Sequence, residues 1–172
     1  ANTAIGVDAA TFITTGQNNT AFGSTSLYSL TEGGANTAIG YGSLYSVTTG
    51  ESNTAVGTNS GFNLTTGGYN SLFGIDAGRS LTIGGDNVAI GDGALYAEDT
   101  GSNNVAIGEY ALSSVTGGSY NTAVGPEALT NLVSGYGNTA LGGQAFNQLS
   151  SGNNNIALGA TAGNYLVSGV SN

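Results

Sequence analysis

The stretch Asn2-Thr3-Ala4-Ile5-Gly6 opens a pattern that runs through the whole chain. Its asparagine recurs at every seventeenth position without an insertion or deletion, at Asn2, Asn19, Asn36, Asn53, Asn70, Asn87, Asn104, Asn121, Asn138, Asn155 and Asn172. A period held this often is the signature of a stacked repeat array and outweighs local propensities. We therefore treat residues 1–172 as one array of ten repeats that begin at the first ten of these asparagines. The positions of each repeat are numbered 1 to 17 from its asparagine.

Two glycine positions punctuate every repeat. Position 5 is Gly from Gly6 to Gly159, and position 15 is Gly from Gly16 to Gly169. Invariant Gly at two points of a period indicates two corners per coil. We expect an extended segment around positions 1–5 and a second one over positions 8–13, because no window has a helical apolar period. The sequence predicts an all-β parallel β-solenoid, or β-roll, of ten coils stacked about 4.8 Å apart.

Two apolar columns are the candidates for the interior. Position 4 is apolar in every repeat: Ile5, Phe22, Ile39, Val56, Phe73, Ile90, Ile107, Val124, Leu141 and Leu158. Position 12 is apolar in nine repeats and is Glu98 in the tenth. With position 4 as core, the alanines of position 3 face outward, where they let a neighbouring backbone approach closely. An Ile39→Asp substitution is then expected to split the array locally, because it buries an unpaired charge.

The asparagine column itself predicts an amide ladder. Stacked Asn side chains can each hydrogen-bond to the one above and the one below. The alternative is a turn role, since Asn tolerates the left-handed conformation. Ser and Asp never replace this residue, which favours the ladder or a related buried hydrogen bond.

Composition excludes several classes of function. The chain has a formal charge of −9, Arg79 is its only cationic side chain, and it contains no His and no Cys. A chain with this charge is not attracted electrostatically to nucleic acid or to anionic membranes. The missing residue types remove disulfides, thiolate metal sites and the usual nucleophile–base arrangements. No apolar run approaches the roughly 18 residues that are needed to span a bilayer, so we expect no membrane insertion, and we expect no cofactor.

Acidic residues offer the only catalytic or metal-binding alternatives. Glu98 and Asp99, with Asp86 and Asp92 near in sequence, could form a carboxylate pair for glycoside hydrolysis. The same residues with Asp76 could bind calcium. However, the acids other than Glu98 and Asp99 fall at expected turn positions, and no repeat has a spaced calcium-binding Asp pattern. We expect no catalytic and no metal site, and interpret Glu98-Asp99 as a bulge or local change of register.

A threonine column suggests a different surface. Position 13 carries Thr14, Thr31, Thr48, Thr65 and Thr82. Ranked Thr on a flat solenoid face is the arrangement used by ice-binding proteins. Ordinary β-propensity also explains Thr at such positions, and position 14 beside it is interrupted by Glu32 and Ile83.

Aromatic residues form the last candidate surface. Tyr28, Tyr45 and Phe62 follow one another at position 10 and could contact sugars or a partner. Stacking along the rod, or burial between chains, is the interpretation we favour. Further tyrosines fall in corner positions and could serve lateral contact or adhesion: Tyr41, Tyr69, Tyr110, Tyr120 and Tyr136.

Two repeats carry a family resemblance. The stretches Asn87-Val88-Ala89-Ile90-Gly91 and Asn104-Val105-Ala106-Ile107-Gly108, with Ala111 shortly downstream, resemble the head repeats of trimeric autotransporter adhesins (YadA-like heads with haemagglutinin-type repeats). Related repeats occur in phage tail fibres and bacterial surface fibres. The resemblance implies a left-handed β-roll, three chains side by side, and attachment to a cell-surface or glycan receptor. The adhesin coil is shorter than the repeat of this chain, so cross-section and trimer packing can differ.

These observations predict a non-enzymatic extracellular fibre or stalk at a cell surface or on a virion. We expect it to be structural and adhesive, and to assemble as a homotrimer. Neither end has the polar, atypical repeat expected of a cap, so the array is also expected to continue or to stack end to end. A phage tail-fibre shaft segment and an ice-binding β-solenoid are the alternatives.

Overall fold

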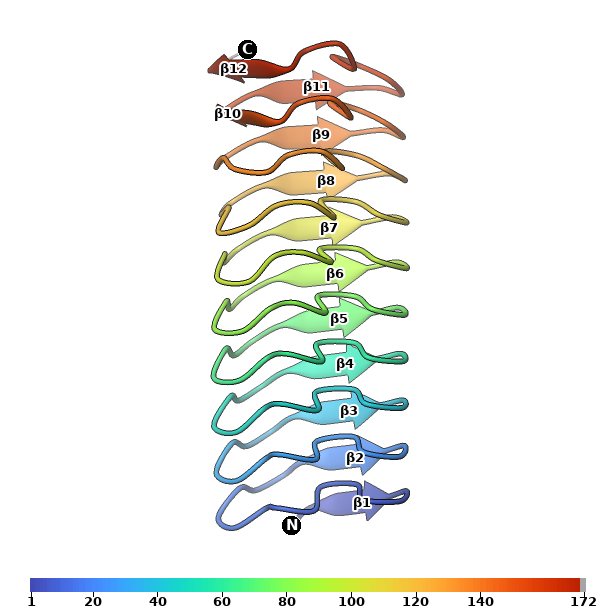
Figure 1. Cartoon of the computed structure of the whole chain (residues 1–172), viewed down its shortest axis with the longest axis vertical. Helices are drawn as coiled ribbons and strands as arrows, with labels where there is room; N and C mark the ends of the chain where they lie inside the picture. The colour runs from blue at the N-terminus through green and yellow to red at the C-terminus, as the bar shows by residue number, and fades with distance from the viewer. Residues whose placement is uncertain (171–172) are drawn as a thin grey trace.

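The structure is a computed structural model that describes residues 1–170. It is a parallel β-solenoid in which the repeats stack as successive coils of a rod (Figure 1). The described residues contain strands and turns but no helix. The predicted fold class and the length of the coil are therefore confirmed. Asn172 lies outside the described residues.

One wall of the rod is a ten-stranded parallel sheet, to which each coil contributes its positions 2–4. Its strands are β1 (Thr3–Ile5), β2 (Thr20–Phe22), β3 (Thr37–Ile39), β4 (Thr54–Val56), β5 (Ser71–Phe73), β6 (Val88–Ile90), β7 (Val105–Ile107), β8 (Thr122–Val124), β9 (Thr139–Leu141) and β11 (Ile156–Leu158). A second, two-stranded parallel sheet pairs β10 (Ser151–Asn153) with β12 (Ser168–Val170). Every pairing joins the same positions of adjacent repeats, as in Thr37 with Thr54.

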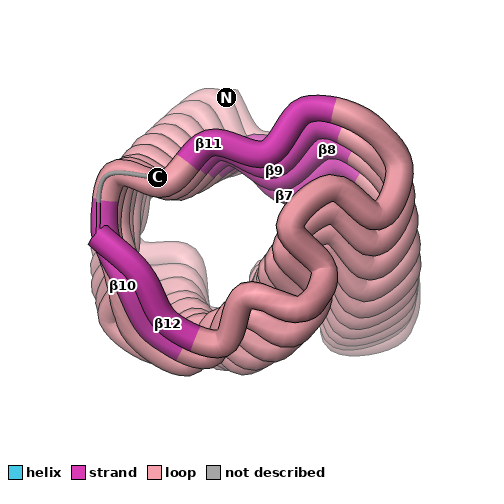
Figure 2. The backbone as a smooth tube through the Cα atoms, turned by 90° about the horizontal axis from the view of Figure 1, so that it is seen from above, coloured by secondary structure: helices cyan, strands magenta, loops and turns pink. Residues whose placement is uncertain are grey.

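The coil is left-handed. Seen from the C-terminal end, the chain passes from β10 to β11 and continues clockwise as it rises toward the viewer (Figures 1 and 2). The two sheets lie on different walls of the rod, with turns between them (Figure 2).

Glycine at position 5 is required by both conformation and space. Gly23 has φ of +139°, and a Cβ built on it would lie 2.5 Å from the carbonyl oxygen of Gly40 in the next coil. The same close approach recurs along this column. A side chain here would push two coils apart, so Gly at this position is required for the close spacing of the coils.

The predicted second extended segment over positions 8–13 is wrong. These residues form turns, and positions 7, 9 and 17 adopt left-handed φ even where they are not Gly, as in Asn59 (φ 53°), Leu44 (φ 50°) and Tyr69 (φ 61°). A non-Gly residue in this region costs roughly 1–2 kcal/mol. The surrounding coils supply that energy through burial, since Leu44 is fully buried.

The interior is also arranged differently from our prediction for position 4. The side chains of Ile39 and Ile90 at position 4 are 38% and 41% exposed, whereas Ala38 and Ala89 at position 3 are fully buried. Successive residues of a strand point to opposite faces, and position 3 shares the inward face with the asparagine of position 1. The ten side chains assigned to the core at position 4 therefore form the outer face of the sheet: Ile5, Phe22, Ile39, Val56, Phe73, Ile90, Ile107, Val124, Leu141 and Leu158.

The core is built instead from positions 3, 8, 9 and 12. Position 12 is confirmed as interior, with Leu30, Val47 and Leu64 fully buried. Position 9 adds large buried side chains that the sequence analysis did not assign: Leu27, Leu44, Leu95, Leu112, Leu129 and Phe146. Because these long side chains cross the narrow lumen, the facing wall has room only for alanine.

Leu72 shows this complementarity directly. It is the only residue at position 3 that is not Ala. Position 9 is Gly78 in the same coil and Gly61 in the preceding coil. Built on either glycine, a Cβ would lie 2.8 Å from a Leu72 methyl carbon. Leu72 thus fills the volume that leucines at position 9 occupy elsewhere.

Candidate interaction face

The predicted asparagine ladder is confirmed and fixes the edge of the sheet. Asn53 donates through Nδ2 to Asn36 Oδ1 (3.1 Å) and to the Gly67 carbonyl (2.9 Å). Its own Oδ1 accepts from the backbone N–H of Asn70 at 3.0 Å. The pattern spans the column Asn2, Asn19, Asn36, Asn53, Asn70, Asn87, Asn104, Asn121, Asn138 and Asn155. Asn53 is fully buried, so this polar column is part of the interior.

With positions 1 and 3 turned inward, positions 2 and 4 form the outer face of the ten-stranded sheet, which we call the sheet face. Position 4 is a ridge of large apolar side chains, including Phe22 (54% exposed) and Phe73 (39%). Position 2 is a shelf of smaller residues: Thr3, Thr20, Thr37, Thr54, Ser71, Val88, Val105, Thr122, Thr139 and Ile156. Soluble monomers rarely expose a continuous apolar strip of this length.

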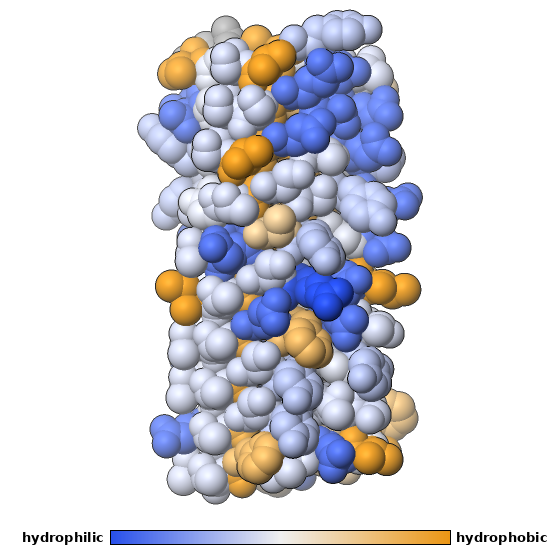
Figure 3. Space-filling view, viewed as in Figure 1, coloured by the Kyte–Doolittle hydropathy of each residue, from blue (hydrophilic) through white to orange (hydrophobic). Residues whose placement is uncertain are grey.

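The sheet face carries no charge. None of its twenty positions is Asp, Glu, Lys or Arg, although the chain has ten acidic residues. Figure 3 views the wall of β10 and β12, opposite the ten-stranded sheet, where polar and apolar side chains are interspersed. The uncharged, continuous ridge therefore distinguishes one side of the rod.

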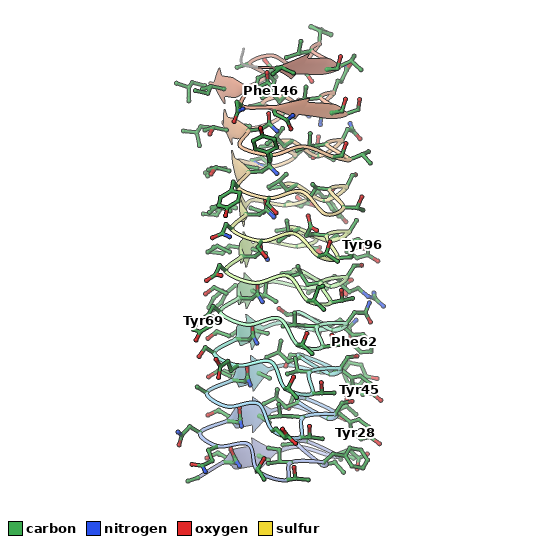
Figure 4. All side chains as sticks on the ribbon, turned by 90° about the vertical axis from the view of Figure 1, so that its left-hand side faces the viewer. Tyr28, Tyr45, Phe62, Tyr69, Tyr96 and Phe146 are labelled. Carbon is green, nitrogen blue, oxygen red and sulfur yellow. The ribbon has the colours of Figure 1, made fainter. Side chains whose placement is uncertain are left out.

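The aromatic column lies away from the sheet face. Tyr28, Tyr45 and Phe62 project from the opposite side of the rod, whereas Tyr69 lies on the side of the strands (Figure 4). The rings of Tyr28 and Tyr45 are stacked with centroids 5.0 Å apart, and those of Tyr45 and Phe62 at 4.9 Å. Arg79 covers Phe62, with its guanidinium carbon 5.8 Å from the ring centroid. The stacking interpretation is confirmed, and the occupied ring faces are not open to a sugar.

The threonines of position 13 use their hydroxyl groups within the rod. Thr31 Oγ1 donates to the Thr48 carbonyl at 3.1 Å, and Thr65 Oγ1 donates to the Thr82 carbonyl at 2.9 Å. Backbone amides of the same turns donate to the same carbonyls. This column therefore adds rungs between coils, which is a structural role.

The acidic residues do not converge on a site. Among residues 1–170, no group of three or more His, Cys, Asp or Glu side chains is placed to hold a metal ion. Asp76 forms an ion pair with Arg79 at 3.3 Å. Glu98 is fully buried at position 12, whereas the adjacent Asp99 is exposed. Glu98 keeps the period of the array, so the predicted bulge or register change is wrong.

The corner tyrosines are exposed, from 46% at Tyr110 to 65% at Tyr120. Tyr69 Oη lies 3.2 Å from Glu51 Oε1. The charge of Glu51, together with this hydrogen bond, raises the pKa of the Tyr69 hydroxyl. Each of these exposed side chains combines an apolar ring with a polar hydroxyl group, a combination that suits contact with another surface.

A shallow hollow of about 540 Å³ lies near the C-terminal end of the array. It is lined by Gly117, Ser119, Ser134, Gly135, Tyr136, Ser151, Gly152 and Asn153. These neutral residues lie where turns give way to isolated bridges, Ser119 with Tyr136 and Ser134 with Ser151, and then to the pairing of β10 with β12. They do not by themselves identify a ligand.

The comparisons with known proteins give no relative: no protein-family model, curated protein or solved structure matches the chain. Within the described part of the chain, no helix is long and apolar enough to cross a bilayer.

Proposed function

We propose that this chain is a non-enzymatic shaft segment of an extracellular fibre, structural and adhesive, whose copies associate through the sheet face as a homotrimer. The observation that carries the proposal is the uncharged apolar ridge that extends over all ten strands of the sheet. A ridge of this kind is stabilised when another apolar surface covers it. The ten-coil rod supplies a stiff support for it.

The size of the sheet face fits contact with further copies. Ten short strands about 4.8 Å apart, with their outward side chains, give roughly 500–700 Å² per copy. Stable interfaces bury on the order of 600–1,000 Å² on each partner. In a ring, each copy divides its sheet face between two neighbours, so flanking apolar residues such as Val7 and Ile75, each more than half exposed, are needed to enlarge both contacts.

Charge favours the same face. Two copies of a chain with net charge −9 repel one another wherever acidic residues meet. Contact across the sheet face avoids this, because all ten acids lie at other positions of the repeat.

Shape favours a cyclic assembly. Parallel copies share the same coil spacing, so the position 4 ridge of one copy can lie against the position 2 shelf of the next along the full length of the rod. Contacts between two different surfaces of this kind close into a ring when the rotation from one copy to the next is a whole fraction of a turn. The resemblance to trimeric adhesins suggests a ring of three, in which corner tyrosines that do not flank the sheet, such as Tyr110 and Tyr136, are left outside for a cell-surface or glycan receptor. A phage tail-fibre shaft is the same proposal in a virion.

The proposal is tested by light scattering of the purified chain, with electron micrographs of the same sample. One chain is 16.8 kDa, so we expect a mass of three times that value and short rods. Long fibres would indicate additional end-to-end assembly. A monodisperse species with the mass of a single chain at micromolar concentration would contradict self-association.

Ice binding is a second candidate because of one observation. Thr occupies position 2 in six of the ten repeats, in two runs from Thr3 to Thr54 and from Thr122 to Thr139. These threonines face outward on the parallel sheet. Phe22 and Phe73 on the same face make the surface less regular. Thermal hysteresis in a dilute solution of the chain would support this candidate.

A further inference from the structure

Glu98 occupies a place that belongs to an apolar side chain in the other coils. Position 12 of the neighbouring coils is Leu81 and Val115, both fully buried. A Cβ built on Gly84 would lie 3.0 Å from the terminal Leu81 carbon Cδ2, and one built on Gly101 would lie 2.6 Å from Glu98 Cδ and Oε2. The carboxyl group of Glu98 thus fills the space of a leucine isopropyl group.

One carboxyl oxygen replaces a backbone acceptor. In a regular coil, the amides of positions 13–15 donate to the position 13 carbonyl of the next coil, as Thr31 and Glu32 do to Thr48 (3.0 and 3.1 Å). Here Glu98 Oε1 instead accepts from the amides of Thr100 (3.1 Å) and Gly101 (2.5 Å). It also accepts from Gly117 of the next coil at 2.7 Å. Glu98 therefore joins the coil of residues 87–103 to the coil of residues 104–120, and we call this junction the Glu98 seam.

The surroundings of the other carboxyl oxygen, Glu98 Oε2, favour the protonated form of the side chain. Glu98 Oε2 is buried and has no hydrogen-bond partner in the described part of the chain. The Gly118 carbonyl oxygen borders the same space beside Gly101 that Oε2 borders. An ionised Oε2 would place its charge near the negative end of that carbonyl dipole. A protonated Oε2 would offer a donor to it.

The charged surroundings agree with this geometry. Burial raises the pKa of the Glu98 carboxyl above its usual 4.5, and the charge of Asp99 raises it further, against the three backbone N–H groups, which lower it. The side chains stacked on Glu98 from the two adjacent coils, Leu81 and Val115, are not titratable.

We propose that Glu98 is protonated in the closed rod, and that its ionisation loosens the Glu98 seam and makes this junction a pH-sensitive point of the array. The folded seam binds the proton more tightly than the open chain does. The seam is therefore closed at low pH. It weakens as the pH rises from the pKa of glutamate in the open chain toward the pKa of Glu98 in the folded seam. At a pH above the pKa of Glu98 in the folded seam, no further weakening is expected.

Native-state hydrogen exchange of the full chain from about pH 4.5 to about pH 8.5 tests this inference, with the amides of Thr100, Gly101 and Gly117 as reporters. After correction for the intrinsic exchange rate, we expect the opening equilibrium of these amides to rise on the order of tenfold per pH unit while the proton is being lost. The amides of the Asn53 coil should not respond.

Matched variants distinguish an effect of Glu98 ionisation from an effect of its shape and hydrogen bonds alone. E98Q keeps the shape, the acceptor oxygen and a donor toward Gly118, so it should fold and hold the three amides protected at every pH. E32Q, which removes an exposed acid of a regular coil, should retain the wild-type pH response. An E98Q profile as pH-dependent as the wild type, or a wild-type profile that is flat across the range, would overturn the inference. Neither result depends on the proposed trimer.

Discussion

Asn53 shows how a single residue sets the period of the rod. Its amide joins three coils, because it donates to Asn36 and Gly67 and accepts from Asn70. Only a side chain with both a donor and an acceptor can repeat this pattern in every coil. Aspartate lacks the donor and serine lacks the reach, which explains why neither replaces Asn in this column.

Replacing Asn53 with alanine removes these bonds and leaves buried partners unsatisfied. We expect an Asn53→Ala variant to lose about 3 kcal/mol of unfolding free energy, since each buried hydrogen bond contributes about 1 kcal/mol and orphaned groups add to the loss. Chemical denaturation followed by circular dichroism measures this. Asn63→Ala, at an exposed position 11, is the control and should change stability by less than about 0.5 kcal/mol. Equal effects of the two substitutions would contradict the ladder's role.

For the short strand of each coil, the sequence predicted the stacking correctly but the direction of the position 4 side chain wrongly. The period, the parallel stacking and the ladder follow from the spacing of Asn and Gly alone. The direction of Ile39 did not follow from hydrophobicity, which placed it inside. It follows from parity, because a buried Asn36 at position 1 requires Ala38 to face inward and Ile39 to face outward. Combining the ladder with strand alternation would have given the correct face.

Position 9 was not predictable in the same way. Leu44 is buried in a left-handed turn, a conformation that propensities disfavour for leucine. Only the stacking of identical turns makes that conformation favourable. The sequence does show that Leu72 replaces the usual Ala at position 3 where Gly61 and Gly78 replace the usual Leu at position 9. The two changes can be connected only when it is known that positions 3 and 9 face each other.

This complementarity predicts that substitutions at positions 3 and 9 are energetically coupled. Ala38→Leu alone should destabilise the rod by about 1–3 kcal/mol, because the lumen there is already filled by Leu27 and Leu44. Adding Leu27→Gly and Leu44→Gly to Ala38→Leu recreates the arrangement around Leu72. The change in stability caused by Ala38→Leu should then become smaller or reverse in sign, as measured by a thermodynamic cycle. A strictly additive result would show that positions 3 and 9 do not share one volume.

A cavity at the same place gives an independent check. Leu72→Ala removes a fully buried side chain that faces Gly61 and Gly78 at position 9, which have no side chain to fill the space. We expect a loss of about 2–5 kcal/mol in thermal or denaturant unfolding. Ile90→Ala, on the sheet face, is the comparison and should cost clearly less in the isolated chain.

At the scale of the whole molecule, the rod has two chemically distinct sides. The sheet face has no charged side chain and carries a continuous ridge of large apolar residues, whereas the acidic residues and the aromatic stack lie at other positions of the repeat (Figure 4). In the proposed fibre shaft, the sheet face would be buried between copies and the other walls would face outward. The Ile39→Asp substitution, first expected to split the core, instead becomes a probe of association.

The most direct test of the sheet face is the solution mass of two matched double variants. Ile39→Glu with Ile90→Glu adds two charges to the sheet face, and Asn63→Glu with Gln148→Glu adds the same two charges at exposed position 11 on another wall. Light scattering of both, beside the unmodified chain, should show the first as a folded 16.8 kDa monomer and the second at the mass of the unmodified assembly. An unchanged assembly in the sheet-face variant, or loss of assembly in the position 11 variant alone, would contradict the account.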